Sequence, residues 1–208
     1  MKFRNKKDHF YAAVNNIINN DKLYNSIIKL QNELVMLLNH EPKVVAIVAP
    51  IARSHSSLMA KAISEVYAHN NEKTLLIDLD MHEPTLDKIY NLNCDESAEN
   101  SNENTNKAPI KINDYLDVAI SHTKVYQAKF LVSDEFKKTI ELARTNYNHV
   151  IILLPPVLEN HDILLLKNEL DAIVLSTKKE ETLIKDIEKS IEFFKINKLP
   201  YVGTIIIN

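Results

Sequence analysis

The sequence predicts an α/β fold, a doubly wound and mostly parallel sheet of about six to seven strands between helices, in three α/β/α layers. Short apolar runs rich in β-branched residues recur along the chain, as strands buried on both faces require. Segments with the apolar spacing of helices separate these runs, and such alternation is typical of βαβ units. The expected strands are Val44–Ala49, Thr74–Leu79, Asp114–Ser121, His149–Leu154, Asp171–Ser176 and Tyr201–Asn208.

Each expected helix has apolar residues three or four positions apart, which places them on one face. Ser57–Ala68 shows this spacing, and Asn70 or Asn71 can end that helix in a left-handed conformation. Ser133 has the hydroxyl that an N-cap needs, so a helix is expected from there to Asn146. The other expected helices are Phe10–Asn19, Leu23–Leu38, His161–Leu170 and Thr182–Lys195.

Length and composition restrict the class of protein. The 208 residues suit one domain with a sizeable core, and the apolar share of 45% and charged share of 25% are near the globular average. A formal net charge of −3 gives no sign of nucleic-acid binding. Cys94 is the single cysteine, which favours a reducing compartment, and no signal peptide follows Met1. We therefore expect a cytoplasmic protein without a membrane-spanning segment.

The chain divides into a basic N-terminal segment with a helix, residues 1–22, and a single domain, residues 23–208. The basic residues of MKFRNKKDHF either belong to a solvated end or make a weak contact with an anionic membrane surface. The apolar stripe of Leu23–Leu38 either packs on the sheet or forms an oligomer contact. Residues 91–109 contain a polar, acidic run without periodicity, so a mobile surface loop is expected there.

The segment Val44–Leu92 is the expected centre of function, because its two strands end at the sheet edge where ligands bind in such folds. Asp78 and Asp80 lie at this carboxyl edge, at the end of the second strand. They either supply oxygen ligands to Mg²⁺ or cap the loop and a helix at Met81–Thr85. Gly203 is the only glycine, and this count excludes every glycine-rich phosphate-binding loop.

Three ordered motifs give the chain a family resemblance. They are LLIDLDMHEPTLDKIYNL at Leu75–Leu92, VIILLPPVLENHD at Val150–Asp162 and DAIVLSTKKEET at Asp171–Thr182. With these motifs, the stretch from Ser26 to Asn208 resembles the bacterial tyrosine kinases, or BY-kinases, of capsule and exopolysaccharide synthesis. These kinases are relatives of the MinD and ParA ATPases, so the resemblance implies a P-loop NTPase-like fold. It also implies ATP and Mg²⁺ as the ligands, and tyrosine phosphorylation as the activity, of an intact family member.

The phosphate loop is where this chain departs most from the family pattern. ARSHSSL, at Ala52–Leu58, aligns with the family's PGEGKST. Arg53 and His55 then stand in place of both glycines, and Ser56 stands in place of the lysine. Ser57 alone keeps its family role, as the hydroxyl on the magnesium side.

Other positions keep or lose further parts of the family's site. Asp78 and Asp80 remain as vestigial catalytic candidates, but His82 replaces the arginine that follows them in the family. Leu153 replaces an aspartate that would organise the metal and a water. The resemblance thus implies a weak, vestigial nucleotide site at Arg53, Ser56, Ser57 and Asn208, with Ser57 and Asp78 as weak metal ligands.

These replacements remove most of the expected affinity for nucleotide. A non-glycine residue at positive φ costs about 1–3 kcal/mol, and two such positions are affected. Losing the lysine forfeits a further contact of about 1.5–3 kcal/mol. The sum, on the order of 4–9 kcal/mol, compares with about 8 kcal/mol for a micromolar site. We therefore expect no bound cofactor, although Arg53 offers another geometry for a phosphate.

Two classes of function follow from the resemblance. The first is a pseudokinase, a regulatory or scaffolding partner in polysaccharide synthesis and export. It would bind the cytoplasmic segment of a membrane chain-length or export regulator, or an active BY-kinase paralogue, and would reach the inner face of the membrane through that partner. The second is a divergent but active tyrosine kinase or ATPase that uses Ser57, Asp78 and Asp80. The sequence leaves open whether the chain forms a homo-oligomer. The family's ring-forming helix motif aligns with residues 26–32 only in degraded form.

Overall fold

A computed structural model describes residues 21–38, 43–52, 56–81, 84–92, 108–121 and 127–207 of the chain. The strands are β1 Val44–Val48, β2 Thr74–Asp78, β3 Ile110–Asn113, β4 Leu116–Ile120, β5 His149–Leu153, β6 Ala172–Lys178 and β7 Tyr201–Ile207. They form one sheet in the order β3-β4-β2-β5-β1-β6-β7, in which all neighbours run parallel except β3 and β4. The predicted mostly parallel sheet is confirmed.

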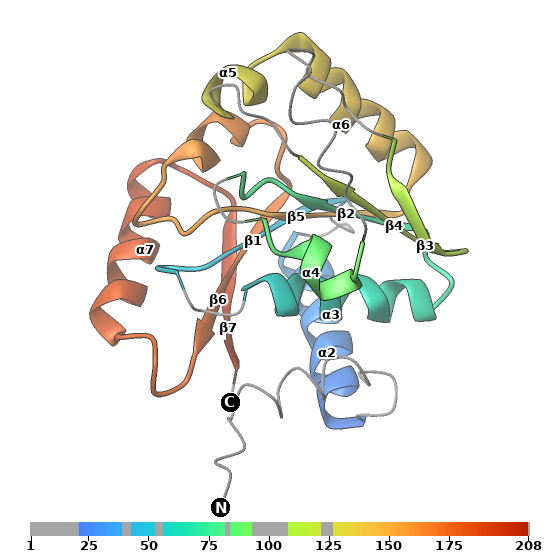
Figure 1. Ribbon diagram of the computed structural model, residues 1–208. Coiled ribbons are helices and arrows are strands. Elements are labelled where there is room, and N and C mark those ends of the chain that lie inside the picture. The colour runs from blue at the N-terminus through green and yellow to red at the C-terminus, as the bar shows by residue number, and fades with distance from the viewer. Residues whose placement is uncertain are drawn as a thin grey trace, which may run out of the picture.

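Helices cover both faces of this sheet. They are α2 Asp21–Leu38, α3 Ser56–His69, α4 Leu86–Tyr90, α5 Gln127–Leu131, α6 Asp134–Asn146, the 3₁₀ helix η3 Asp162–Leu166 and α7 Ile184–Ile196. α2, α3 and α4 lie on one side, and α5, α6 and α7 lie on the other (Figure 1). Side chains alternate between the two sides along each strand, so the molecule has two apolar cores, one under each helical layer.

β1 shows why the sequences of the central strands are continuous apolar runs. All five of its residues are buried. Val45 and Ile47 belong to the core under α3, whereas the alternate residues, Val44, Ala46 and Val48, belong to the core under α6 and α7. A strand covered on both faces has no solvent side on which a polar residue would be favoured.

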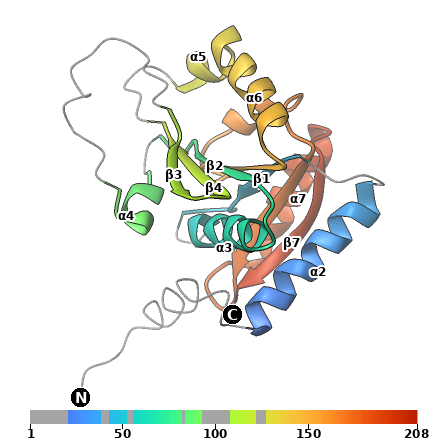
Figure 2. The same cartoon turned by 90° about the vertical axis from the view of Figure 1, so that its right-hand side faces the viewer.

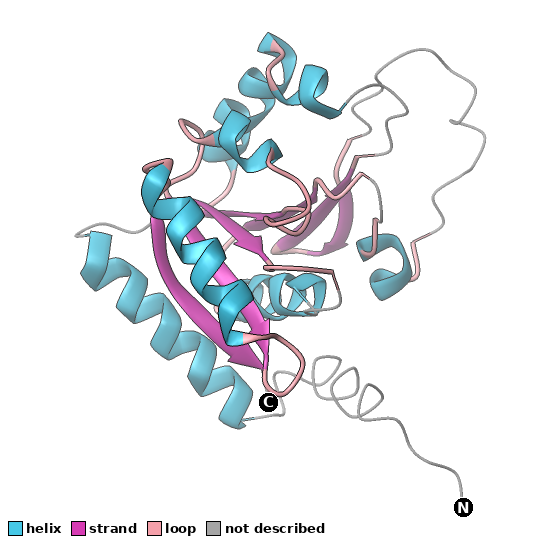
Figure 3. Ribbon diagram, turned by 90° about the vertical axis from the view of Figure 1, so that its left-hand side faces the viewer, coloured by secondary structure: helices cyan, strands magenta, loops and turns pink. Residues whose placement is uncertain are grey.

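α2 packs on the body of the molecule, on the side of α3 and alongside β7 (Figures 2 and 3). Its residues Ile27 and Leu34 are buried in the core under α3. The Tyr24 hydroxyl donates a hydrogen bond to Asn70 Oδ1 at 2.7 Å, which ties α2 to the end of α3. Of the two interpretations of this apolar stripe, intramolecular packing is therefore the one observed.

Two local signals in the sequence are confirmed. Asn71 follows α3 with a φ of 63°, in the left-handed region. Ser133 caps α6, because its Oγ accepts a hydrogen bond from the Phe136 backbone N–H at 3.1 Å. None of the helices in the described ranges has the apolar length that a bilayer crossing requires. The expected helix Phe10–Asn19 and residues 93–107 of the expected polar loop lie outside the described residues.

Three short elements differ from the prediction. β3 was not predicted, and the strand expected from Asp114 begins only at Leu116, because Asp114 and Tyr115 form the turn between β3 and β4. α5 was not predicted either. The helix expected at His161–Leu170 is reduced to the 3₁₀ helix η3. Each of these elements is at most five residues long, which is too short to show a period.

Candidate functional site

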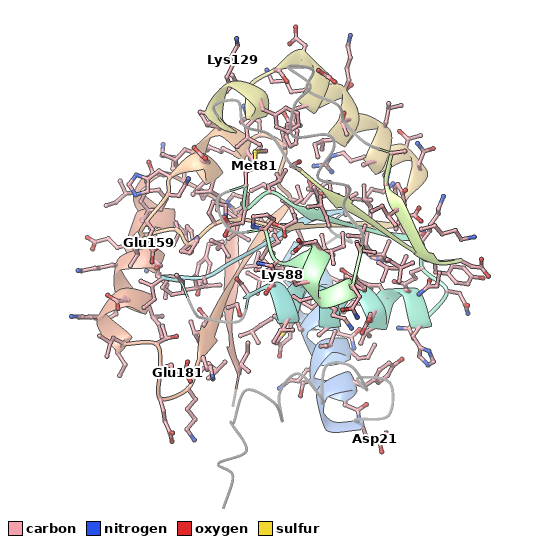
Figure 4. The ribbon with its side chains drawn as sticks, in the orientation of Figure 1. Asp21, Met81, Lys88, Lys129, Glu159 and Glu181 are labelled. Atoms are coloured by element: carbon pink, nitrogen blue, oxygen red, sulfur yellow. The ribbon has the colours of Figure 1, made fainter. Side chains whose placement is uncertain are left out.

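The loops that follow β1, β2 and β5 are joined at the carboxyl edge of the sheet. The Leu79 N–H, after β2, donates to the Leu153 carbonyl of β5 at 2.9 Å. The Val157 N–H, after β5, donates to the Ala49 carbonyl, after β1, at 2.9 Å. Figure 4 labels Glu159, which belongs to the loop after β5. The loops after β1 and β2 therefore lie at one edge, as expected, and the loop after β5 joins them. The side chains of these three loops define the candidate site.

Asp78, the last residue of β2, has an almost fully buried carboxylate. Its Oδ1 accepts a hydrogen bond from the Asp80 backbone N–H at 3.0 Å. Its Oδ2 accepts from the backbone N–H groups of Thr85, at 3.0 Å, and Leu86, at 3.2 Å. Burial raises the pKa of this carboxyl to about 6, although the three N–H groups act in the opposite direction. Asp78 thus fastens the loop to α4, which begins at Leu86 and not within the expected Met81–Thr85.

These hydrogen bonds match one of the two expectations for Asp78, the capping of a loop and helix. Its role as a metal ligand stays a prediction. Asp80, two residues further on, is half-buried, and its role as a catalytic candidate stays a prediction as well. Within the described ranges, no three His, Cys, Asp or Glu side chains come together in a group that would suit a metal ion.

The first turn of α3 carries two hydroxyls at the position of the family's lysine and serine. Ser56 and Ser57 open the helix, and both are half-buried. Arg53, His55 and Asn208 lie outside the described residues. The nucleotide contacts expected of Arg53, Ser56, Ser57 and Asn208 therefore stay predictions.

A carboxylate that the sequence analysis did not single out reaches the loop after β1. Glu159 accepts a hydrogen bond through Oε1 from the Ala52 backbone N–H, at 2.9 Å. Ala52 is the first residue of the segment that aligns with the phosphate loop. An acidic group of the chain itself thus engages a donor at the start of that segment. The available signal was the position of Glu159 shortly after Pro155 and Pro156, in the loop that follows β5 at the same sheet edge.

Leu153 is buried at the end of β5, as predicted. In the sheet it lies between Ile47 of β1 and Asp78 of β2. Its side chain belongs to the apolar core under α3. A carboxylate at this position would lose its hydration directly beside Asp78, and a buried charge without a partner is strongly unfavourable.

A buried ionic cluster links α3 to α4, and the sequence analysis missed it. The Lys61 Nζ lies 2.6 Å from Glu65 Oε1 and 5.1 Å from the centre of the Tyr90 ring. Burial raises the pKa of both the Glu65 carboxyl and the Tyr90 hydroxyl. Spacing alone could not reveal the cluster, because a Lys and a Glu four residues apart are equally typical of a solvent-exposed helix face.

Comparison with known proteins places the fold. No protein-family model matches the chain. The VpsO kinase domain is 17% identical, with 100% of both chains covered and a TM-score of 0.78. The kinase domain of the Escherichia coli tyrosine kinase ETK is 17% identical, with 88% of this chain and 74% of that chain covered and a TM-score of 0.74. The septum site-determining protein MinD of Pyrococcus horikoshii, complexed with Mg-ADP, is 13% identical, with 79% and 69% covered and a TM-score of 0.61.

Proposed function

We propose that this chain, which has the fold of bacterial tyrosine kinase domains and of MinD-type ATPases, is a catalytically degenerate BY-kinase-like protein. In this proposal it is a pseudokinase that regulates or scaffolds other proteins of capsular or exopolysaccharide synthesis and export. The proposal has two parts, the loss of nucleotide chemistry and the retention of a surface for partners.

The hydrogen bond between Ala52 and Glu159 is the observation that carries the first part. In a working phosphate loop, inward-facing backbone N–H groups and a lysine surround the phosphate oxygens. Here the Ala52 N–H donates to a carboxylate, and α3 opens with Ser56 and Ser57. Ala52 aligns with the family's proline, which has no N–H, so this bond takes no phosphate donor away. What counts against phosphate is the negative charge of Glu159 at the start of the segment, which repels a second anion.

Asp78 and Leu153 support the same part of the proposal. Both oxygens of Asp78 already accept backbone N–H groups of its own loop. Leu153 fills the neighbouring strand position with apolar atoms. Catalysis of phosphoryl transfer is mostly the positioning of charges around the phosphate and its metal. One carboxylate, that of Asp78, is already hydrogen-bonded, and the other is replaced by Leu153. In this proposal β2 and β5 therefore lack free carboxylate ligands for the metal that phosphoryl transfer requires.

The second part concerns partners. If the chain does not bind or turn over nucleotide, its proposed role depends on its contacts with other proteins. The resemblance to BY-kinases makes the cytoplasmic segment of a membrane chain-length or export regulator the expected partner, or alternatively an active BY-kinase paralogue. The chain would then be a cytoplasmic protein that reaches the inner face of the membrane through this partner.

Calorimetric titration of ATP with Mg²⁺ into the full chain tests the first part. We expect no binding tighter than about millimolar, since the groups replaced in the loop are together worth about as much as a micromolar site. Saturable heat at about ten micromolar ATP would contradict the proposal. It would favour the divergent kinase or ATPase instead, with Ser57, Asp78 and Asp80 as its working residues.

A kinase assay tests the second part. Increasing amounts of the chain are added to an active BY-kinase together with the cytoplasmic segment of its regulator. We expect the rate of tyrosine phosphorylation to change until the chain saturates its partner, while the chain alone phosphorylates nothing. A rate that stays constant at every added amount would argue against a regulatory role.

A further inference from the structure

The two edge strands of the sheet differ in how well they are protected from pairing with another strand. β3, at one edge, is four residues long and contains Lys111. Its register against β4 shifts between Lys111 and Asn113. Short length, a lysine and an irregular register are features by which natural proteins keep an edge from pairing. This edge is therefore protected.

β7, at the other edge, lacks this protection. It is seven residues long, with the sequence YVGTIII, and contains neither a charged residue nor a proline. Its register shift against β6 lies at the start of the strand, and residues 203–207 then pair with residues 174–178 without interruption. A long, uncharged strand of β-branched residues at a sheet edge is a template for one more strand.

The backbone groups that β7 directs away from the sheet can be identified. The Lys179 N–H donates to the Ile207 carbonyl at 2.8 Å, and the Thr177 hydroxyl donates to the Ile205 carbonyl at 3.1 Å. Both carbonyls therefore face β6. Because consecutive residues of a strand direct their backbone groups to opposite sides, the N–H and C=O groups of Thr204 and Ile206 point outward.

Among the described residues, no strand pairs with these outward groups. α7 lies over one face of the sheet at β6 and β7, and α2 runs alongside β7 on the side of α3 (Figures 2 and 3); neither helix pairs with β7 as a strand. Ile206 is 61% exposed, although it belongs to a strand in a largely apolar sheet. The Thr204 hydroxyl is held by the Tyr201 hydroxyl at 2.7 Å, so this end of the strand keeps its polar side chains satisfied internally.

We propose that β7 pairs antiparallel with the β7 of a second copy of this chain, so that two sheets join across a two-fold axis. Antiparallel pairing lets facing residues exchange both backbone hydrogen bonds, here Thr204 opposite Ile206 of the second copy and the reverse. The strand is self-complementary, because it has no charge that would face the same charge across the axis. Its β-branched side chains form favourable cross-strand pairs, and the two-fold axis closes the assembly at a dimer.

Sedimentation of the full chain and three variants tests the dimer. We expect the parent to sediment at twice the mass of one chain, and Ile206→Pro at the mass of one chain. Proline removes only the outward N–H at this position, so the bonds to β6 stay intact. Ile206→Val keeps both the N–H and the branched side chain and should stay dimeric. Ile184→Lys places a charge on a side chain that is 74% exposed at the start of α7, away from the edge, and should also stay dimeric.

Amide hydrogen exchange on the parent gives a second measurement that does not depend on the folding of any variant. The amides of Thr204 and Ile206 should exchange more slowly as the protein concentration rises, whereas the amides of β3 should not change. A parent that stays monomeric throughout its soluble range overturns the proposal, as does an Ile206→Pro variant that remains a dimer. Exchange at Thr204 and Ile206 that is independent of concentration also overturns it.

Discussion

At the scale of a single residue, Asp78 has the strongest link between structure and pH. Burial raises the pKa of its carboxyl from 3.8 to about 6, against the effect of the N–H groups of Thr85, Leu86 and Asp80. A carboxyl whose pKa is higher in the folded than in the unfolded protein stabilises the fold most when it is protonated. Its contribution is therefore fully present below about pH 4 and is lost as the pH rises through about 6.

Asp78→Asn should remove this part of the pH dependence. The difference between a pKa of 3.8 and one of about 6 corresponds to about 3 kcal/mol. Between pH 4 and pH 7 we therefore expect the parent to lose up to about 3 kcal/mol more unfolding free energy than the variant. Urea denaturation at a series of pH values measures both curves, and all other carboxyls cancel in the comparison. Parallel curves for parent and variant would show that Asp78 does not titrate in this range.

At the scale of the elements, the buried ion pair of Lys61 and Glu65 in α3 lies against Tyr90 of α4. Glu65→Ala leaves the Lys61 ammonium buried without a counter-charge, and we expect a loss of about 3 kcal/mol in unfolding free energy. Adding Lys61→Met removes the second charge and keeps an apolar stem against the Tyr90 ring, so the double variant should regain most of the loss.

The matched control for this prediction is on α2. Lys29 and Glu33 have the same spacing, but their side chains are 78% and 56% exposed. Glu33→Ala should therefore change the unfolding free energy by less than about 0.5 kcal/mol. The prediction is wrong if Glu65→Ala lowers the unfolding free energy no more than Glu33→Ala does. It is also wrong if the double variant has a lower unfolding free energy than Glu65→Ala alone.

Elements with a clear local pattern, either a period or an unbroken apolar run, could be predicted from the sequence, and those without one could not. The five residues of β1 are buried on both faces, so their apolar run predicts a strand without any knowledge of its neighbours. β3 is different, because IKIN is exposed at most positions and forms a strand only by pairing with β4 across the turn at Asp114 and Tyr115. Its formation depends on tertiary context, which a local pattern does not contain.

At the scale of the whole molecule, the sequence predicted that the loops after β1 and β2 meet at one sheet edge, but not all of the contacts between loops there. Strand order alone puts the loops after β1, β2 and β5 at one edge, and the burial of Leu153 follows from its apolar run. The bond between Glu159 and Ala52 joins residues 107 positions apart, and it depends on the conformations of two loops. No spacing in the sequence encodes such a contact.

The contact between Glu159 and Ala52 adds one substitution to a reconstruction of the phosphate loop by mutation. Arg53→Gly, His55→Gly and Ser56→Lys together restore the residues that allow positive φ and supply a cation. We expect this triple variant to bind ATP with Mg²⁺ more tightly than the parent, with about 1.5–3 kcal/mol coming from the lysine. Adding Glu159→Gln should strengthen binding again, because it removes the negative charge beside the Ala52 N–H and keeps the side-chain shape.

Leu153→Asp tests in the same series whether the reconstructed loop holds a metal ion. Alone, it should destabilise the fold by about 3 kcal/mol, because it buries an unpaired charge beside Asp78. Within the reconstructed loop, a bound Mg²⁺ would neutralise that charge, so Mg-ATP should raise the melting temperature of the combined variant most. Calorimetry and thermal unfolding of all variants in one buffer measure both effects. A triple variant that folds but binds ATP no better than the parent would mean that residues 52–58 are not the counterpart of the phosphate loop.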